Sequence, residues 1–164
     1  MEANVKLDRI DINILAQLQR DGSLTNVMLA DAVGLSPSPC LQRVKRLEKA
    51  GYIESYKAHL NLSKLVEHVT VFTQITPNDH HRNDFIKFER EIRRYEYVEE
   101  CHLVSGGYDY LLKFTARSVA HYQEIMEEML ERNIGVEKYF SYIVIKAVID
   151  NGAVPLKALW TDKK

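Results

Sequence analysis

The residues best suited to chemistry lie between positions 36 and 50, where polar and apolar side chains alternate at helical spacing. At about 100° per residue, one side carries the polar residues Ser38, Gln42, Lys45, Arg46 and Lys49. The other side carries the apolar residues Cys40, Leu41, Val44 and Leu47. Arginine and lysine pair with phosphates or guanine edges, glutamine pairs with adenine, and serine pairs with either. The polar side therefore carries the side chains that reading of the DNA major groove uses.

The same segment is locally basic. It has one acidic residue, Glu48, and four basic residues, Arg43, Lys45, Arg46 and Lys49. On an isolated helix such a face is usually only a solvated surface, so the surrounding elements decide between the two interpretations.

The segment is the third of three predicted helices. Apolar residues recur at helical spacing over residues 7–18, and Asp21-Gly22 supplies a stop. Ser23 or Thr25 can cap a second, shorter helix that ends at Gly34. This succession is typical of a helix-turn-helix.

The third helix has its own start and stop signals. It opens at residues 36–39, where serine can cap and proline is tolerated in the first turn, and it ends at Gly51. Residues 52–58 then alternate as a short strand or hairpin does. The pattern predicts a winged helix-turn-helix, in which the outward face of the third helix reads DNA. Residues near its N-terminus should reach bases, and the region of Lys57 in the wing should hold phosphates.

The rest of the chain changes period. Two helices are expected from apolar stripes, Phe85, Phe88 and Ile92 in the first and Tyr122, Ile125, Met126 and Met129 in the second. Strands are expected at 69–75, 98–105, 108–115 and 140–149, with Gly106-Gly107 as a hairpin turn. The resulting order, βαββαβ, is ferredoxin-like. We therefore expect an α+β protein with a winged helix-turn-helix over 1–62, a ferredoxin-like domain over 63–150 and a loose C-terminal tail over 151–164.

The last expected strand is apolar on both sides. Tyr142 and Val144 point one way, while Ile143, Ile145 and Ala147 point the other. Two helices can cover only one face of the sheet, so the open face predicts a partner, most simply a second copy in a two-fold dimer.

The composition of the chain excludes some classes of protein but does not indicate a function. The 164 residues carry a net charge of −1, which indicates no class of partner. No apolar run is long enough to span a bilayer, and the N-terminus lacks the layout of a secretory signal, so a cytoplasmic location and no membrane partner are expected. Cys40 and Cys101 lie in different predicted domains and should be reduced, Cys40 as a buried packing residue.

An enzyme is one alternative, and the residues argue against it. The chain lacks a nucleophile triad, a phosphate-binding glycine loop and metal-ligand spacing, so no catalytic residue, metal or cofactor is expected. The adjacent pair His80 and His81 indicates a solvated polar loop, and His102 indicates a strand residue on the sheet surface.

Two long stretches resemble the leucine-responsive regulatory protein/asparagine regulator (Lrp/AsnC) family of transcription factors. The first runs from Leu7-Asp8-x-x-Asp11 through Gly34-Leu35-Ser36-Pro37-Ser38-Pro39-Cys40 to Gly51-Tyr52-Ile53. The second is Cys101-His102-Leu103-Val104-Ser105-Gly106-x-Tyr108-Asp109-Tyr110. The likeness covers residues 7 to 150.

The resemblance implies a regulator of amino-acid metabolism or transport genes that binds double-stranded DNA and a free amino acid. It implies that the C-terminal domain binds the ligand and assembles dimers into octamers or similar rings. It places the following residues on the recognition helix: Ser36, Ser38, Pro39, Gln42, Arg43 and Arg46. Arg43 lies at the edge of the outward face, so we expect it to position phosphates.

The resemblance also places the effector site at Ser105, Gly106, Gly107, Tyr108 and Asp109. Backbone N–H groups of glycines can hold a carboxylate, and Asp109 can pair with an ammonium group. From the residues alone Gly106-Gly107 favours a plain hairpin turn over a ligand site, and Gly107 stands where relatives often carry an acidic residue. An architectural protein that wraps DNA with weak sequence preference and no effector is the remaining alternative.

Overall fold

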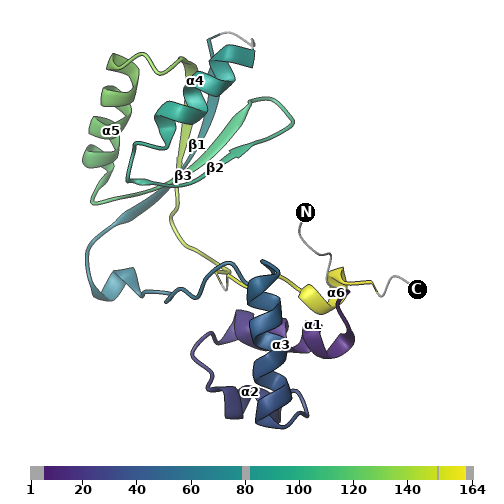
Figure 1. Cartoon of the computed structure of the whole chain (residues 1–164). Coiled ribbons are helices and arrows are strands. Elements are labelled where there is room, and N and C mark those ends of the chain that lie inside the picture. The colour runs from purple at the N-terminus through teal and green to yellow at the C-terminus, as the bar shows by residue number, and fades with distance from the viewer. Residues whose placement is uncertain (1–5, 79–81, 151, 162–164) are drawn as a thin grey trace. The chain divides into compact units, whose positions relative to one another are not determined.

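The computed structural model describes residues 6–78, 82–150 and 152–161, which form two compact units (Figure 1). The helical unit combines the chain up to Leu60 with the chain from Asp150 onward. The sheet unit is Asn61–Ile149. The expected pair His80 and His81 lies outside the described residues.

The helical unit begins with α1 (Arg9–Arg20), which starts where Asp8 caps it. The backbone N–H of Asp11 donates to Oδ1 of Asp8 at 2.9 Å, and the N–H of Asp8 donates to Oδ2 of Asp11 at 3.0 Å. This reciprocal pair satisfies two backbone donors at the helix start. Thr25 caps α2 (Asn26–Ala32) in the same way, through its own side chain.

The third helix, α3 (Pro37–Lys49), follows a tight turn at Gly34, whose φ of +70° lies in the left-handed region that favours glycine. Asn26 stabilises the entry into α3, because its Nδ2 donates to the carbonyl oxygen of Pro37 at 2.8 Å. Gly51, with a φ of +74°, follows the helix. The three predicted helices are therefore confirmed.

The expected wing is not formed as a strand. Between α3 and the first strand of the sheet unit, the described chain contains only the short 3-10 helix η1 (Leu62–Lys64). Alternation predicts which side chains share a face, but a strand also needs a neighbouring strand to pair with. Residues 54–60 are exposed instead, and the hydroxyl of Tyr56 donates to Glu48 of α3 at 2.9 Å.

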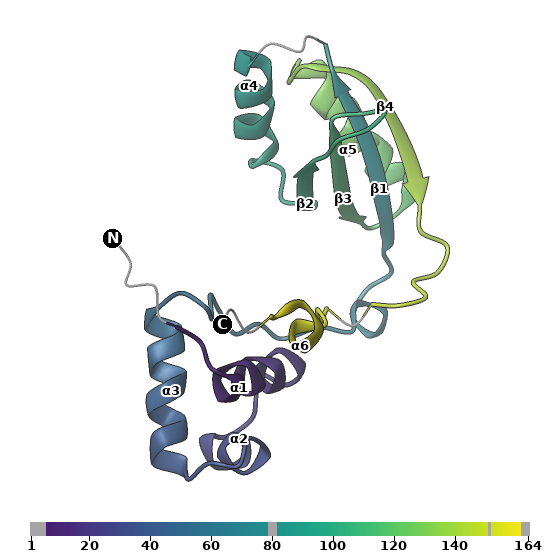
Figure 2. The ribbon, with the colours of Figure 1, turned by 90° about the vertical axis from the view of Figure 1, so that its right-hand side faces the viewer.

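The sheet unit is a four-stranded antiparallel sheet in the order β2-β3-β1-β4 (Figure 2). Its elements in chain order are β1 (Val69–Pro77), α4 (Arg82–Ile92), β2 (Val98–Leu103), β3 (Tyr110–Ala116), α5 (Val119–Glu131) and β4 (Val136–Ile143). The order of elements and of strands is ferredoxin-like, as expected.

One face of the sheet holds the core. Alternate residues of β1 and β3 are buried against both helices, so α4 and α5 cover the same face. This cluster includes Val71, Leu112 and Phe114 from the strands, Phe88 from α4 and Met126 from α5. The other face stays open, as the pattern of alternation predicted.

The last strand begins and ends earlier than expected, at Val136–Ile143 rather than 140–149. Gly135, at a φ of +96°, turns the chain into it. Pairing then runs along β1 until Ile143 lies opposite Val71, near the start of β1. Residues 145–149 have no strand beside them and are exposed, because apolar side chains alone do not provide a pairing partner.

The C-terminal segment is not a loose tail. Its described part forms α6 (Leu156–Leu159), which packs against α1 within the helical unit. Nε2 of Gln19 donates to the carbonyl oxygen of Val154 at 2.8 Å. Trp160, the only tryptophan of the chain, is half-buried and lines a hollow together with Ile12 of α1.

Candidate functional site

The exposed face of α3 gathers most of the polar residues singled out in the sequence. The following are exposed: Ser36, Ser38, Pro39, Gln42, Lys45, Arg46 and Lys49. Cys40 and Leu47 are fully buried on the opposite side. The division of α3 into a core side and an outward side therefore agrees with its helical periodicity.

Leu41 is the exception to that division. We expected it in the core, yet 41% of its surface is exposed. The buried stripe of α3 is narrow, and Leu41 lies about 100° around the helix from Cys40. An exposed aliphatic side chain among polar ones can contact the methyl group of thymine, which periodicity alone did not reveal.

Two arginines of α3 are held by carboxylates at the start of α1. Nη1 of Arg43 donates to Oδ2 of Asp8 at 2.7 Å and to Oδ1 of Asp11 at 2.8 Å. Nη2 of Arg46 donates to Oδ2 of Asp11 at 2.6 Å. The side chain of Asp11 is 0% exposed, so this is a buried carboxylate shared by two guanidinium groups.

These contacts give Arg43 a structural role that the sequence did not indicate. Its half-buried guanidinium joins α3 to α1 and fixes the orientation of α3. Arg46 is more exposed and contacts only Asp11 in this cluster, so it keeps donors for a ligand. Sequence reasoning missed the cluster, although two aspartates at the start of a helix, one of them on its apolar side, were the available signal.

The charges of the cluster reinforce one another. Partial burial by itself would raise the pKa of Asp8, but the N–H of Asp11 and the guanidinium of Arg43 lower that pKa below its ordinary value. Conversely, the hydrogen bonds to Asp8 and Asp11 raise the pKa of Arg43. Both shifts favour the charged forms of Asp8 and Arg43.

The expected effector turn connects β2 to β3. The N–H of Val104 donates to the carbonyl oxygen of Asp109 at 2.8 Å, and the N–H of Asp109 donates to that of Ile75 in β1 at 3.2 Å. Gly106 has a φ of +152°, which side chains rarely adopt, while a Cβ there would meet open space. Ser105, Gly106 and Gly107 are exposed, and Tyr108 and Asp109 are half-buried. The five predicted residues thus form one continuous turn anchored to two strands.

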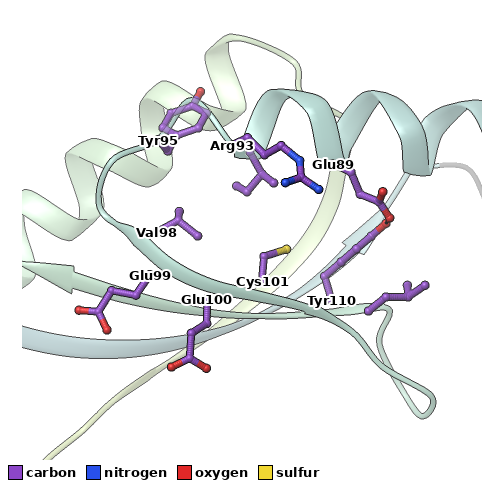
Figure 3. A pocket seen from close by; sticks show the side chains of 10 residues that line it. Glu89, Arg93, Tyr95, Val98, Glu99, Glu100, Cys101 and Tyr110 are labelled. Atoms are coloured by element: carbon purple, nitrogen blue, oxygen red, sulfur yellow. The ribbon is translucent and has the colours of Figure 1, made fainter. Parts of the chain in front are cut away.

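A cavity of about 400 Å³ lies beside this turn, between the C-terminal end of α4 and the edge strand β2 (Figure 3). The hydroxyl of Tyr110 donates to Oε1 of Glu89 at 2.9 Å. Burial, together with the negative charge of Glu89, raises the pKa of Tyr110 and raises that of the Cys101 thiol to about 11. Sequence reasoning missed this cavity, although Glu89 and Arg93, one helical turn apart with opposite charge, were visible.

The two cysteines and His102 lie outside any metal-binding or catalytic arrangement within the described residues. Cys40 is a free and buried thiol, as expected, and Cys101 is also free. His102 lies on β2, where Nε2 is 2.9 Å from Oε2 of Glu100. Across the described residues, no group of histidine, cysteine and carboxylate side chains is arranged to hold a metal ion, and no helix is long and apolar enough to cross a membrane.

A helix-turn-helix with an exposed polar third helix, followed by a ferredoxin-like unit, defines a DNA-binding transcriptional regulator with a ligand-binding domain. Residues 7–54 match a winged helix-turn-helix DNA-binding family, and residues 70–154 match the Lrp/AsnC ligand-binding domain. The chain belongs to the Lrp/AsnC family of transcriptional regulators, so the resemblance read from its motifs is confirmed.

Similar proteins carry regulator names. The transcriptional regulatory protein DoeX of Halomonas elongata is 47% identical over 88% of this chain and 91% of its own length. The leucine-responsive regulatory protein of Escherichia coli is 43% identical over 92% of each chain. These relatives are regulators rather than enzymes, which confirms that this chain is not an enzyme.

Solved structures agree with the sequence relatives. A Neisseria meningitidis transcriptional regulator in complex with L-Met superposes with a TM-score of 0.87 at 32% identity, covering 94% of this chain and 99% of its own. An AsnC family regulator from Agrobacterium tumefaciens gives a TM-score of 0.87 at 30% identity, covering 94% of this chain and 100% of its own.

Proposed function

We propose that α3 reads an operator directly, and that a free amino acid bound at the turn 105–109 controls how many copies of α3 engage one DNA segment. The observation that carries the proposal is the exposed polar face of α3, held rigidly by the buried carboxylate of Asp11. A preoriented helix does not have to be ordered at the moment of binding, which favours specific recognition.

Within α3 the residues divide by position. Ser36, Ser38, Pro39 and Gln42 occupy the N-terminal half, which reaches base edges when a recognition helix enters the major groove. Lys45, Arg46 and Lys49 lie further along and suit phosphates. Arg43 acts through Asp8 and Asp11, as a residue that positions the helix.

A pair of substitutions tests this division. Gln42→Ala should lower affinity for the operator by about 1–3 kcal/mol and leave affinity for random duplexes unchanged. Lys49→Ala should weaken binding to both duplexes equally and flatten the dependence on salt concentration. Lys64→Ala, an exposed lysine of the sheet unit, is the control and should change neither. Equal losses on both duplexes for Gln42→Ala would remove its assigned role.

The turn 105–109 suits an amino acid. Glycine N–H groups can hold its carboxylate and Asp109 can pair with its ammonium group. The L-Met complex of the Neisseria meningitidis regulator and the leucine-responsive relatives support this class of ligand. The regulator would then act in the cytoplasm and control genes of amino-acid metabolism or transport.

The open face of the sheet suits a second copy of the chain. Phe72 and Leu111 are half-buried there, and Phe140 and Tyr142 of β4 are about half-exposed. Lys138 lies 4.9 Å from the centre of the Phe140 ring, within cation–π distance. Such an exposed apolar face favours a two-fold dimer, and dimers would assemble further into an octamer or a similar ring.

The coupling between amino-acid binding and operator binding is tested by sedimentation and footprinting with and without L-leucine or L-methionine. We expect the amino acid to shift the distribution of oligomers and the operator affinity together. Protection of a short palindromic site is expected, with half-sites separated by whole helical turns of about 10 bp. Uniform protection regardless of sequence would instead indicate an architectural protein.

A further inference from the structure

The cavity between α4 and β2 has the size and shape of a ligand site. Its volume of about 400 Å³ falls within the range of roughly 300–1,000 Å³ that small-molecule pockets occupy. Figure 3 shows Glu89 and Arg93 reaching from the helical side towards the strand that carries Cys101. Glu89 of α4 and Arg93, the residue that follows α4, therefore present opposite charges to the same hollow.

Arg93 is available to bind a ligand. Its neighbours Arg90 and Arg94 both pair with Glu91, at 3.0 and 2.6 Å. Among the described residues no hydrogen bond or ion pair involves Arg93, although it faces the cavity and is exposed. A guanidinium group left unpaired at a cavity wall can bind a carboxylate with two parallel hydrogen bonds.

Glu89 is held in place by a rigid partner. Its Oε1 accepts the hydroxyl hydrogen of Tyr110, whose buried ring packs 4.6 Å from the Phe88 ring and 5.8 Å from the Phe85 ring. Its Oε2 makes no hydrogen bond or ion pair within the described parts of the chain. One oxygen thus fixes the carboxylate, and the other can accept a hydrogen bond from an ammonium group.

The rest of the lining is mixed. Ile92, Val98 and Leu103 add apolar surface. The carboxylates of Glu99 and Glu100 also line the cavity, but both already pair with Lys113, at 2.9 and 3.5 Å. A ligand that pairs with both Glu89 and Arg93 and also covers the apolar surface must carry a positive group, a negative group and an aliphatic part. A simple anion would face Glu89 and a simple cation would face Arg93, so either would leave a like-charge contact.

We propose that this cavity is a second binding site for a zwitterionic α-amino acid with an aliphatic side chain, whose carboxylate pairs with Arg93 and whose ammonium group pairs with Glu89. The spacing fits, because side chains one helical turn apart have Cβ atoms about 5–6 Å from each other. This inference rests on the proposed function in one respect only, namely that the ligand is a free amino acid. The site presents different groups from the turn 105–109, whose charged residue is Asp109.

Cys101 makes the cavity directly observable. It lines the cavity, whereas Cys40 is fully buried, so N-ethylmaleimide applied to the native protein should modify Cys101 first. The rate, followed by intact mass, should fall about tenfold when L-leucine or L-methionine is present at ten times its Kd. Acetate and butylamine, which each carry only one of the two charges, should protect far less.

Variants then separate this site from the turn. Glu89→Gln and Arg93→Gln should each abolish protection, judged by the ratio of rates with and without ligand, and the matched control Arg90→Gln should retain it. Asp109→Asn should lose the coupling to DNA affinity while Cys101 stays protected. Absent protection in the unsubstituted protein, or protection that survives Arg93→Gln and Glu89→Gln, would overturn the second site. Loss of the proposed function would appear separately, as oligomer distribution and operator affinity that do not respond to the amino acid.

Discussion

The two units hold themselves together by different means. Among the described residues, the buried apolar cluster of the sheet unit has 13 members, whereas that of the helical unit has five, so the helical unit gains less from apolar burial. It adds a buried carboxylate, Asp11, bound by Arg43 and Arg46. Charge therefore adds to packing in orienting α3, whereas the sheet is held mainly by packing.

The largest expected effect tests the packing of the sheet unit. Phe114 is fully buried at the centre of the sheet, with its ring 5.4 Å from that of Tyr122. Phe114→Ala should lower the free energy of unfolding by about 3–5 kcal/mol, because it removes a large ring and leaves a cavity. Urea unfolding followed by far-UV circular dichroism measures this loss. Trp160 fluorescence reports the helical unit, and an equal shift of both signals would mean that the two units unfold as one.

The next effect tests the charge cluster. Asp11→Ala removes the carboxylate that accepts the N–H of Asp8 at the start of α1, and it leaves two arginines without their buried partner, so we expect a loss of about 2–4 kcal/mol. Trp160 fluorescence during urea unfolding is the measurement, and operator affinity should fall as well. Asp31→Ala, an exposed aspartate on α2, is the matched control and should stay within about 0.5 kcal/mol of the parent. A small effect of Asp11→Ala would mean that packing orients α3 without help from charge.

A smaller effect compares two glycines. Gly51 follows α3 with a φ of +74°, so Gly51→Ala should cost about 1–2 kcal/mol because a Cβ disfavours that conformation. Gly107 in the sheet unit has no left-handed φ and open space where its Cβ would lie, so Gly107→Ala should be nearly neutral. Thermal unfolding of both variants checks the difference, and similar losses would contradict the backbone argument.

The smallest effect is a dependence on pH. The pKa of Asp8 is lower folded than unfolded, so its contribution is present above its ordinary value of 3.8 and disappears as pH falls through the lowered value. Because its side chain is half-exposed, solvent screening keeps that contribution below about 1 kcal/mol. In the Asp8→Asn variant, the stability of the helical unit, measured by Trp160 fluorescence during urea unfolding, should therefore fall less steeply at acid pH. Glu99→Gln should act on the circular dichroism of the sheet unit instead, since Thr115 and Lys113 outweigh burial and lower the pKa of Glu99.

Sequence periodicity predicted the three helices, the βαββαβ order and the outward face of α3, because amphipathic spacing and capping residues are local signals. It placed the last strand too late and predicted a wing strand, because pairing depends on a neighbouring strand that no local pattern specifies. The ion pairs of Arg43 were not predicted for the same reason, since its partners Asp8 and Asp11 lie more than 30 residues away. The grouping of Glu89 with Cys101 and Tyr110 likewise arises only from the fold.

The helical unit is completed by a segment that follows the sheet unit in the sequence. Because α6 packs on α1, the sheet unit is an insertion between two parts of the helical unit. A ribosome delivers α1 first and α6 last, after all four strands have been made. The helical unit therefore acquires the contact between α6 and α1 only after the sheet unit has been made, so a chain interrupted within the sheet unit would carry α3 without the segment that covers α1.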